Sequence, residues 1–244
     1  MPKESPKEPR SAWHDWRNDG RELAIVVIGV LIALLAQQVV QGWEWQQKIH
    51  AAEDAMKHEL LWDDGPQIYQ RAMMHPCLSQ RLDAIRAAVE DHAPRDRIIA
   101  LVDTYQVFPL SYDVVAQQAA TASDVTTHIN QDILQPYMLS YAVMPDFGHT
   151  AQVEQEHIAR LHALSRKGGP LSEAETIQVL NAVELLHNDD RFMYSAARWS
   201  IPQLRKLGAV DPERLQTFTD IARKSFGDCI KPLPGDFPKG IPID

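Results

Sequence analysis

The feature that most restricts the fold of this chain is an uncharged apolar run near its start. Residues 23–40 read LAIVVIGVLIALLAQQVV, and sixteen of these eighteen residues are apolar or Gly. As a helix the run is roughly 27 Å long, about the thickness of the hydrocarbon core of a bilayer. A cleaved signal peptide would need a small residue where Leu34 lies, three positions before a cut after Ala36, and a soluble core helix is rarely this free of charge. The run therefore predicts one retained transmembrane helix over residues 23–42, with the lipid bilayer as its partner.

Tryptophans flank the run on both sides. Trp13 and Trp16 precede it, and Trp43 and Trp45 follow it. An indole ring has an apolar body and one polar edge, so it prefers the headgroup layer of a membrane. We expect these four residues to anchor the two interfaces of a single crossing.

Basic residues predict the orientation of that crossing. Residues 1–22 hold five Lys or Arg, whereas the twenty residues that follow Trp43 hold only two. By the positive-inside rule, residues 1–22 form a short cytoplasmic N-terminus and residues 43–230 a domain outside the cytoplasm. We expect a protein of the bacterial inner membrane with its helical domain in the periplasm. The net charge of −9 opposes nucleic-acid binding, which normally needs a basic face.

The same region carries a resemblance to known proteins. A G-R-E start at residues 20–22 leads into V-V-I-G-V-L-I-A-L at residues 26–34, then Gln37-Gln38 and Trp43-Glu44. This pattern resembles a family of uncharacterised bacterial single-pass membrane proteins, classed as a domain of unknown function. The resemblance covers roughly residues 20–62, and the chain has Trp-Glu-Trp where that family has W-N-E. It implies the topology and helical character, and no activity.

The rest of the chain predicts an all-α fold. Residues 44–62 continue as good helix formers, and Asp63-Asp64-Gly65-Pro66 predicts the end of that helix. Further segments of helical character are separated by seven prolines, and no run alternates like a strand. Ser172 with Glu175 forms a capping box, and Asp211-Pro212 is a second helix start. We expect a periplasmic bundle of five to seven segments, followed by a Pro-rich extended tail at 231–244. The prolines are Pro94, Pro109, Pro136, Pro145, Pro170, Pro202 and Pro212.

The two cysteines, Cys77 and Cys229, fall on the oxidising side of the membrane in this topology. An even number of cysteines in that compartment favours a disulfide. Two buried free thiols are the alternative, because Cα atoms more than about 7 Å apart cannot be bridged. The prediction is a bridge that stabilises the fold.

Two E-x-x-H motifs, Glu154 with His157 and Glu184 with His187, are candidates for metal binding. Residues at i and i+3 share a helix face, and two such motifs plus two further carboxylates make the di-iron site of ferritin-like bundles. The two motifs lie on neighbouring late helices, however, whereas such bundles alternate them with single-Glu helices. Ordinary surface histidines are the commoner interpretation. We therefore expect no metal and no cofactor, and keep a di-metal redox protein as the enzyme alternative.

The membrane helix gives the best functional lead. Gly29, Ala33 and Ala36 form a stripe of small residues that allows close helix approach. Gln37 and Gln38 place amides at the outer end of the span, where a partner helix, a second copy or headgroup water must satisfy them. These five residues predict an intramembrane contact with other membrane proteins or with the chain itself.

We find no sequence motif for nucleophilic, nucleotide or metalloprotease chemistry in the chain. The sequence therefore predicts a non-catalytic protein that acts through protein–protein interaction. It would be an accessory or scaffold subunit of a larger membrane assembly, or a self-associating anchor. A periplasmic ligand-sensing module is a further alternative, which would need a partner to carry its signal inward.

Overall fold

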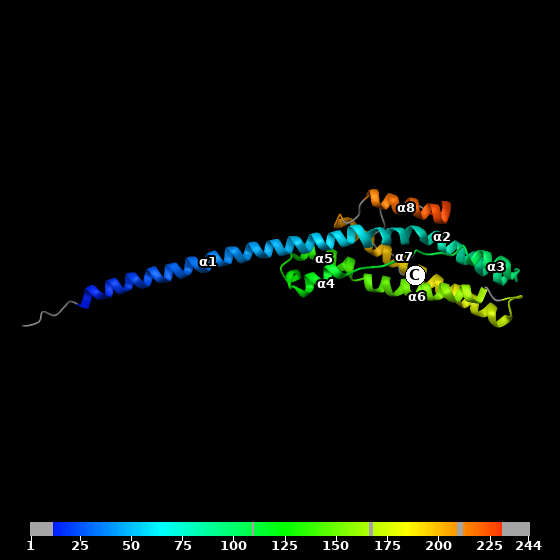
Figure 1. Cartoon of the computed structure of the whole chain (residues 1–244), viewed down its shortest axis with the longest axis horizontal. Helices are drawn as coiled ribbons and strands as arrows, with labels where there is room; N and C mark the ends of the chain where they lie inside the picture. The colour runs from blue at the N-terminus through cyan, green and yellow to red at the C-terminus, as the bar shows by residue number, and fades with distance from the viewer. Residues whose placement is uncertain (1–11, 109, 166–167, 209–211, 231–244) are drawn as a thin grey trace, which may run out of the picture. The chain divides into compact units, whose positions relative to one another are not determined.

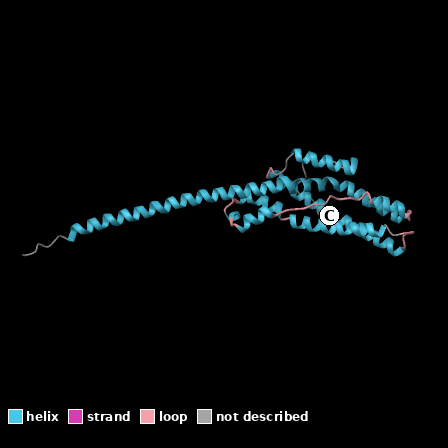
Figure 2. Ribbon diagram, in the orientation of Figure 1, coloured by secondary structure: helices cyan, strands magenta, loops and turns pink. Residues whose placement is uncertain are grey.

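The computed structural model describes residues 12–108, 110–165, 168–208 and 212–230. Within these ranges the chain consists of helices and the loops between them (Figure 2). The all-α prediction is therefore confirmed. The chain divides into two compact units, Met1–His50 and Ala51–Asp244, and each is described by itself.

The first unit contains most of the long helix α1, Ala12–Glu59 (Figure 1). Its apolar run is long enough to cross a membrane, and none of the most apolar stretch is buried. A soluble core helix would bury such a stretch, because exposed apolar surface is unfavourable in water. The exposed apolar helix agrees with the predicted membrane anchor.

The second unit is a bundle in which α2 packs against α7, and α6 also packs against α7 (Figure 1). Helix α3 contacts α2 and α6, and α8 lies along α2. Buried apolar side chains from α2, α3, α6, α7 and α8 form one continuous core. The helices are α2 Gly65–Glu90, α3 Arg95–Val102, α4 Val115–Ala122, α5 Gln131–Tyr141, α6 Met144–Ser165, α7 Glu173–Lys206 and α8 Pro212–Phe226.

Local start signals account for several of these helices. The Ser172 side chain accepts a hydrogen bond from the Glu175 N–H, and the Glu175 carboxylate accepts one from the Ser172 N–H, which confirms the predicted capping box of α7. Helix α8 begins at Pro212 as predicted. The predicted cap Asp211, the N-terminal residues 1–11 and the predicted tail at 231–244 lie outside the described residues.

The predicted helix end at residues 63–66 is wrong. A π-helical turn, η1 at Leu60–Asp64, joins α1 directly to α2, and the Gly65 N–H donates to the Leu60 carbonyl. Gly65 has ordinary right-handed helical angles (φ −56°, ψ −53°) rather than the left-handed angles of a helix end. Pro66 lies in the first turn of α2, where a missing N–H is tolerated, so the helix continues through the sequence that suggested a stop.

Two of the prolines expected to separate helices lie in helix interiors instead. Pro136 is in α5 and Pro202 is in α7. A proline inside a helix removes one backbone hydrogen bond, and tertiary contacts must offset the loss. In α5 the buried Tyr141 donates its hydroxyl hydrogen bond to the Met56 carbonyl, and in α7 Ile201 is fully buried. Packing therefore decided the helix lengths at these positions.

Candidate functional site

The predicted membrane-contact residues all lie on the exposed surface of α1. Gly29, Ala33, Ala36, Gln37 and Gln38 are exposed. A Cβ atom added at Gly29 would meet nothing within 4 Å. The small-residue stripe is thus open for another helix to approach, and the contact itself stays a prediction.

The predicted interface tryptophans lie on the same helix. Trp13 and Trp16 belong to its first turns, and Trp43 is largely exposed. Trp45 is half-buried, and the Lys48 ammonium lies 4.9 Å from the centroid of its ring. Their contact with a membrane is not tested by these positions and stays a prediction.

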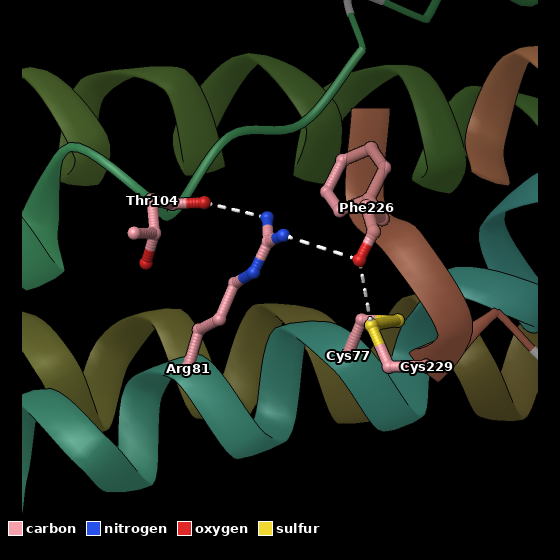
Figure 3. Close-up of a disulfide and its surroundings, with 5 residues drawn as sticks. All are labelled: Cys77, Arg81, Thr104, Phe226 and Cys229. Atoms are coloured by element: carbon pink, nitrogen blue, oxygen red, sulfur yellow. Dashed lines mark hydrogen bonds between the residues drawn. A yellow bond between two sulfur atoms is a disulfide. The ribbon is translucent and has the colours of Figure 1, made fainter. Parts of the chain in front are cut away.

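The predicted disulfide between Cys77 and Cys229 is confirmed. The two Cα atoms are 5.2 Å apart, and the bridge ties the middle of α2 to the turn that follows α8. Arg81, one turn beyond Cys77, donates hydrogen bonds to the carbonyls of Thr104 and Phe226, and its guanidinium lies 4.6 Å from the Phe226 ring centroid (Figure 3). The bridge is therefore part of a braced junction between α2, the loop after α3 and the end of α8.

The two E-x-x-H motifs do not form a common site. Each of their four side chains has a polar partner outside the motifs. Glu154 pairs with Arg71, His157 with Asp189, Glu184 with Arg86 and Arg191, and His187 with Asp83. Across the described ranges, no group of three or more His, Cys, Asp or Glu side chains is arranged to hold a metal ion.

The most unusual cluster in the second unit is a buried ionic network centred on Arg71 of α2. One nitrogen, Nη2, donates to Glu154 Oε1 of α6 at 2.7 Å and to Asp190 Oδ1 of α7 at 3.1 Å. All three side chains are at most 1% exposed. Tyr105, also buried, donates its hydroxyl to Glu154 Oε1 at 3.3 Å. The network joins three helices through one guanidinium.

Arg71 keeps its charge despite its burial. Burial by itself would lower the pKa of Arg71, but the Glu154 and Asp190 carboxylates more than offset it, so the pKa is raised. Burial raises the pKa of Glu154, and Arg71 opposes that shift. Arg71 Nε and Nη1 have no hydrogen-bond partner within the described part of the chain. Such a network holds a fold together only while every charge keeps its partner.

The network reaches the surface through His75. Its Nδ1 lies 2.6 Å from Asp190 Oδ2, and its ring stacks on Tyr194 with 4.0 Å between centroids. His75 lines an open pocket of about 310 Å³ together with Ser79, Arg86, Glu184, His187 and Arg191. Each basic side chain of this pocket has an acidic partner, and Arg86 and Arg191 share the same one, Glu184.

A second buried polar cluster lies at the π-turn. Glu59 and Asp64 are 9% and 0% exposed. Glu59 Oε2 accepts a hydrogen bond from the Ala116 N–H at 2.9 Å, and Asp64 Oδ1 accepts one from the Asp113 N–H at 3.1 Å. Glu59 thus caps the N-terminus of α4 from a different helix. The second oxygen of each carboxylate, Glu59 Oε1 and Asp64 Oδ2, is buried and has no hydrogen-bond partner among the described residues.

Neither cluster was predicted from the sequence. Arg71, Glu154 and Asp190 each have apolar residues at three- and four-residue spacing, but polar residues such as Gln67, His75 and His157 occur at the same spacing, so this signal was weak. Asp64 was assigned to a turn, because Asp-Asp-Gly-Pro is typical of helix ends.

Comparison with known proteins adds no relative to this picture. No protein-family model, curated protein or solved structure matches the chain.

Proposed function

We propose that this chain is a single-pass protein of the bacterial inner membrane that acts by binding other proteins rather than by catalysis. In this proposal residues 23–42 cross the membrane, the N-terminus is cytoplasmic, and the helical domain is periplasmic. The observation that carries the proposal is the exposed apolar run of α1, which has no buried stretch to explain it as a core helix. The resemblance of residues 20–62 to single-pass proteins points the same way.

The disulfide supports a domain outside the cytoplasm. Structural disulfides persist in oxidising compartments and are rare where glutathione and thioredoxin keep thiols reduced. The Cys77–Cys229 bridge therefore suits the periplasm, and the basic residues before the span suit an N-terminus inside.

The same helix supports interaction as the function. Gly29, Ala33 and Ala36 leave one face of α1 without bulky side chains, and Gln37 adds an amide that hydrocarbon cannot satisfy. Such a face suits a helix of an accessory-subunit partner or a second copy. The chain would then work as a scaffold or a self-associating anchor.

Topology is tested with full-length fusions to alkaline phosphatase, which becomes active only where its own disulfides form. A fusion at the C-terminus should be active, and a fusion at the N-terminus inactive. The reverse pattern, or two inactive fusions, would refute the periplasmic assignment.

Interaction is tested by purifying the tagged full chain from native membranes in mild detergent. We expect a defined set of membrane proteins or a discrete homo-oligomer. The double variant Gly29→Leu with Gln37→Leu should release the partner proteins or dissociate the homo-oligomer, because both changes alter the small-residue face. Val27→Leu, on the opposite side of the helix, is the matched control and should leave the complex intact. A monomer without partners in the unmodified chain would contradict the proposal.

A further inference from the structure

The π-turn brings two acidic side chains together that an α-helix would separate. Residues five apart on an α-helix are about 140° apart around the axis. In a π-turn each N–H bonds the carbonyl five residues back, so residues five apart lie one turn from each other. The Gly65 N–H bond to the Leu60 carbonyl shows this register. Glu59 and Asp64 flank that turn and therefore share a face.

Both carboxylates face residues 111–116, the segment that leads into α4. The Asp113 and Ala116 N–H groups occupy one oxygen of each acid. Next to them, the Gln67 side chain accepts a hydrogen bond from the Ser111 N–H at 3.0 Å and donates one to the Ser111 carbonyl at 2.9 Å. Side chains of the π-turn and the first turn of α2 thus hold this segment in place.

The remaining oxygens create an electrostatic problem. Within the described part of the chain, Glu59 Oε1 and Asp64 Oδ2 are buried and have no hydrogen-bond partner, and two ionised carboxylates in such a site would repel each other. The strongest charges that act on Asp64 belong to Glu59, Asp63 and Asp113, all of them acids. A proton on one of the two oxygens would convert two unpartnered acceptors into a donor and an acceptor.

We propose that Glu59 and Asp64 hold one proton between them, forming a pH-sensitive latch that fixes residues 111–116 to the helix leading to the membrane anchor. The latch is closed while the proton is bound. Loss of the proton leaves two negative charges on one face of the π-turn, and the segment leading into α4 separates from it.

The surroundings of Asp64 place its titration above neutral pH. Burial is the main cause that raises the pKa of Asp64, to about 8, while its hydrogen bond from Asp113 lowers the pKa and Glu59, Asp113 and Asp63 raise it further. Burial raises the pKa of the Tyr141 phenol, which donates to the Met56 carbonyl, and burial also raises the pKa of the Tyr112 phenol. Both phenols therefore stay neutral, and the proton at stake belongs to the acid pair.

The sign of the pH effect follows from linkage. A carboxyl whose pKa is higher in the closed state than in the open state contributes stability at low pH and loses it as the pH rises through the closed-state value. Amide protection at Asp113 and Ala116 should therefore fall by about tenfold per pH unit between pH 5 and pH 7, and level off above pH 8.

The experiment uses the full chain in detergent micelles. Infrared difference spectra between pH 6 and pH 9.5 should show a carboxylic-acid band that disappears near pH 8, and hydrogen exchange should show the fall in protection at Asp113 and Ala116. Asp64→Asn should remove the band and make the protection independent of pH. Asp63→Asn, an exposed neighbour on the same turn, is the matched control. It should keep both the band and the pH dependence, with a midpoint only slightly lower, because the Asp63 charge is the smallest of the causes that raise the pKa of Asp64.

Two results would overturn the latch. One is the absence of a carboxylic-acid band at pH 7 in the unmodified chain, and the other is a pH dependence that survives Asp64→Asn. If Asp64→Asn fails to fold, Glu59→Gln is the second variant. It removes the like charge beside Asp64, so the band should disappear at a lower pH than in the unmodified chain. An unchanged midpoint would show that the two acids are not coupled.

Discussion

Removing Arg71 should cost far more stability than removing any exposed charge of the domain. Arg71→Met keeps the length of the side chain and deletes the guanidinium. The change leaves Glu154 without its ionic partner, and Asp190 keeps only His75, which lines the surface pocket. Breaking a buried ion pair in this way costs about 3–5 kcal/mol, because an uncompensated charge stays buried. We therefore expect the unfolding free energy to fall by that amount.

The assay is urea unfolding of the full chain in detergent micelles, followed by circular dichroism. A lower midpoint at unchanged slope reports a loss of stability. Arg86→Met is the matched control, since Arg86 is 35% exposed and pairs with the exposed Glu184. An exposed pair of this kind contributes about 0–1 kcal/mol.

A combined variant tests the electrostatic cause directly. Arg71→Met with Glu154→Gln and Asp190→Asn removes all three charges, so no ion is left buried alone. We expect this variant to be more stable than Arg71→Met by itself. The reasoning is refuted if Arg71→Met costs no more than Arg86→Met, or if the combined variant is as unstable as the single one.

Two further predictions concern the ends of the helices. Replacing both Cys77 and Cys229 by Ala should lower the unfolding free energy by about 2–5 kcal/mol. A reductant should lower the urea midpoint of the unmodified chain to that of the double variant. An unchanged urea midpoint would show that the bridge contributes little to stability. Ser172→Ala should cost about 1 kcal/mol through the lost cap of α7, whereas Ser195→Ala, exposed in the middle of the same helix, should change the midpoint little. Hydrogen bonds from the Ser172 N–H and hydroxyl lower the pKa of Glu175 to about 2. The Glu175 carboxylate therefore contributes to stability above the ordinary pKa of a glutamate, and this contribution is lost as the pH falls through about 2. Carboxyl resonances in NMR titrations should show a midpoint near 2 for Glu175, and Ser172→Ala should raise that midpoint.

The sequence predicted the features that depend on local chemistry. The apolar run at residues 23–40 is visible in the sequence by itself. The capping box depends only on Ser172 and Glu175, and Pro212 favours a helix start whatever the rest of the chain does. The pairing of Cys77 with Cys229 was also predictable, because the chain has only two cysteines and the topology places both on one side of the membrane.

Features that depend on tertiary contacts could not be predicted in the same way. Pro136 and Pro202 read as helix breaks, and buried neighbours in the bundle overrode them. The Arg71 network brings together residues 83 and 119 positions apart, a separation that no pattern within one helix reveals. The π-turn inserts one extra residue per turn into a helix whose sequence shows an ordinary stop signal, so the pairing of Glu59 with Asp64 follows from the backbone register alone.

In the proposed topology, where the first helix is the anchor, the disulfide has a mechanical consequence. Cys77 and Cys229 are 152 positions apart in the sequence, yet the bridge makes them covalent neighbours. A force applied at Ile230 reaches α1 through the bridge, the first half of α2 and the π-turn. Helices α3 to α8 lie outside that path, so the load would not unfold them first. A pull at the residue that follows Cys229 therefore reaches α1 along a covalent path that bypasses α3 to α8.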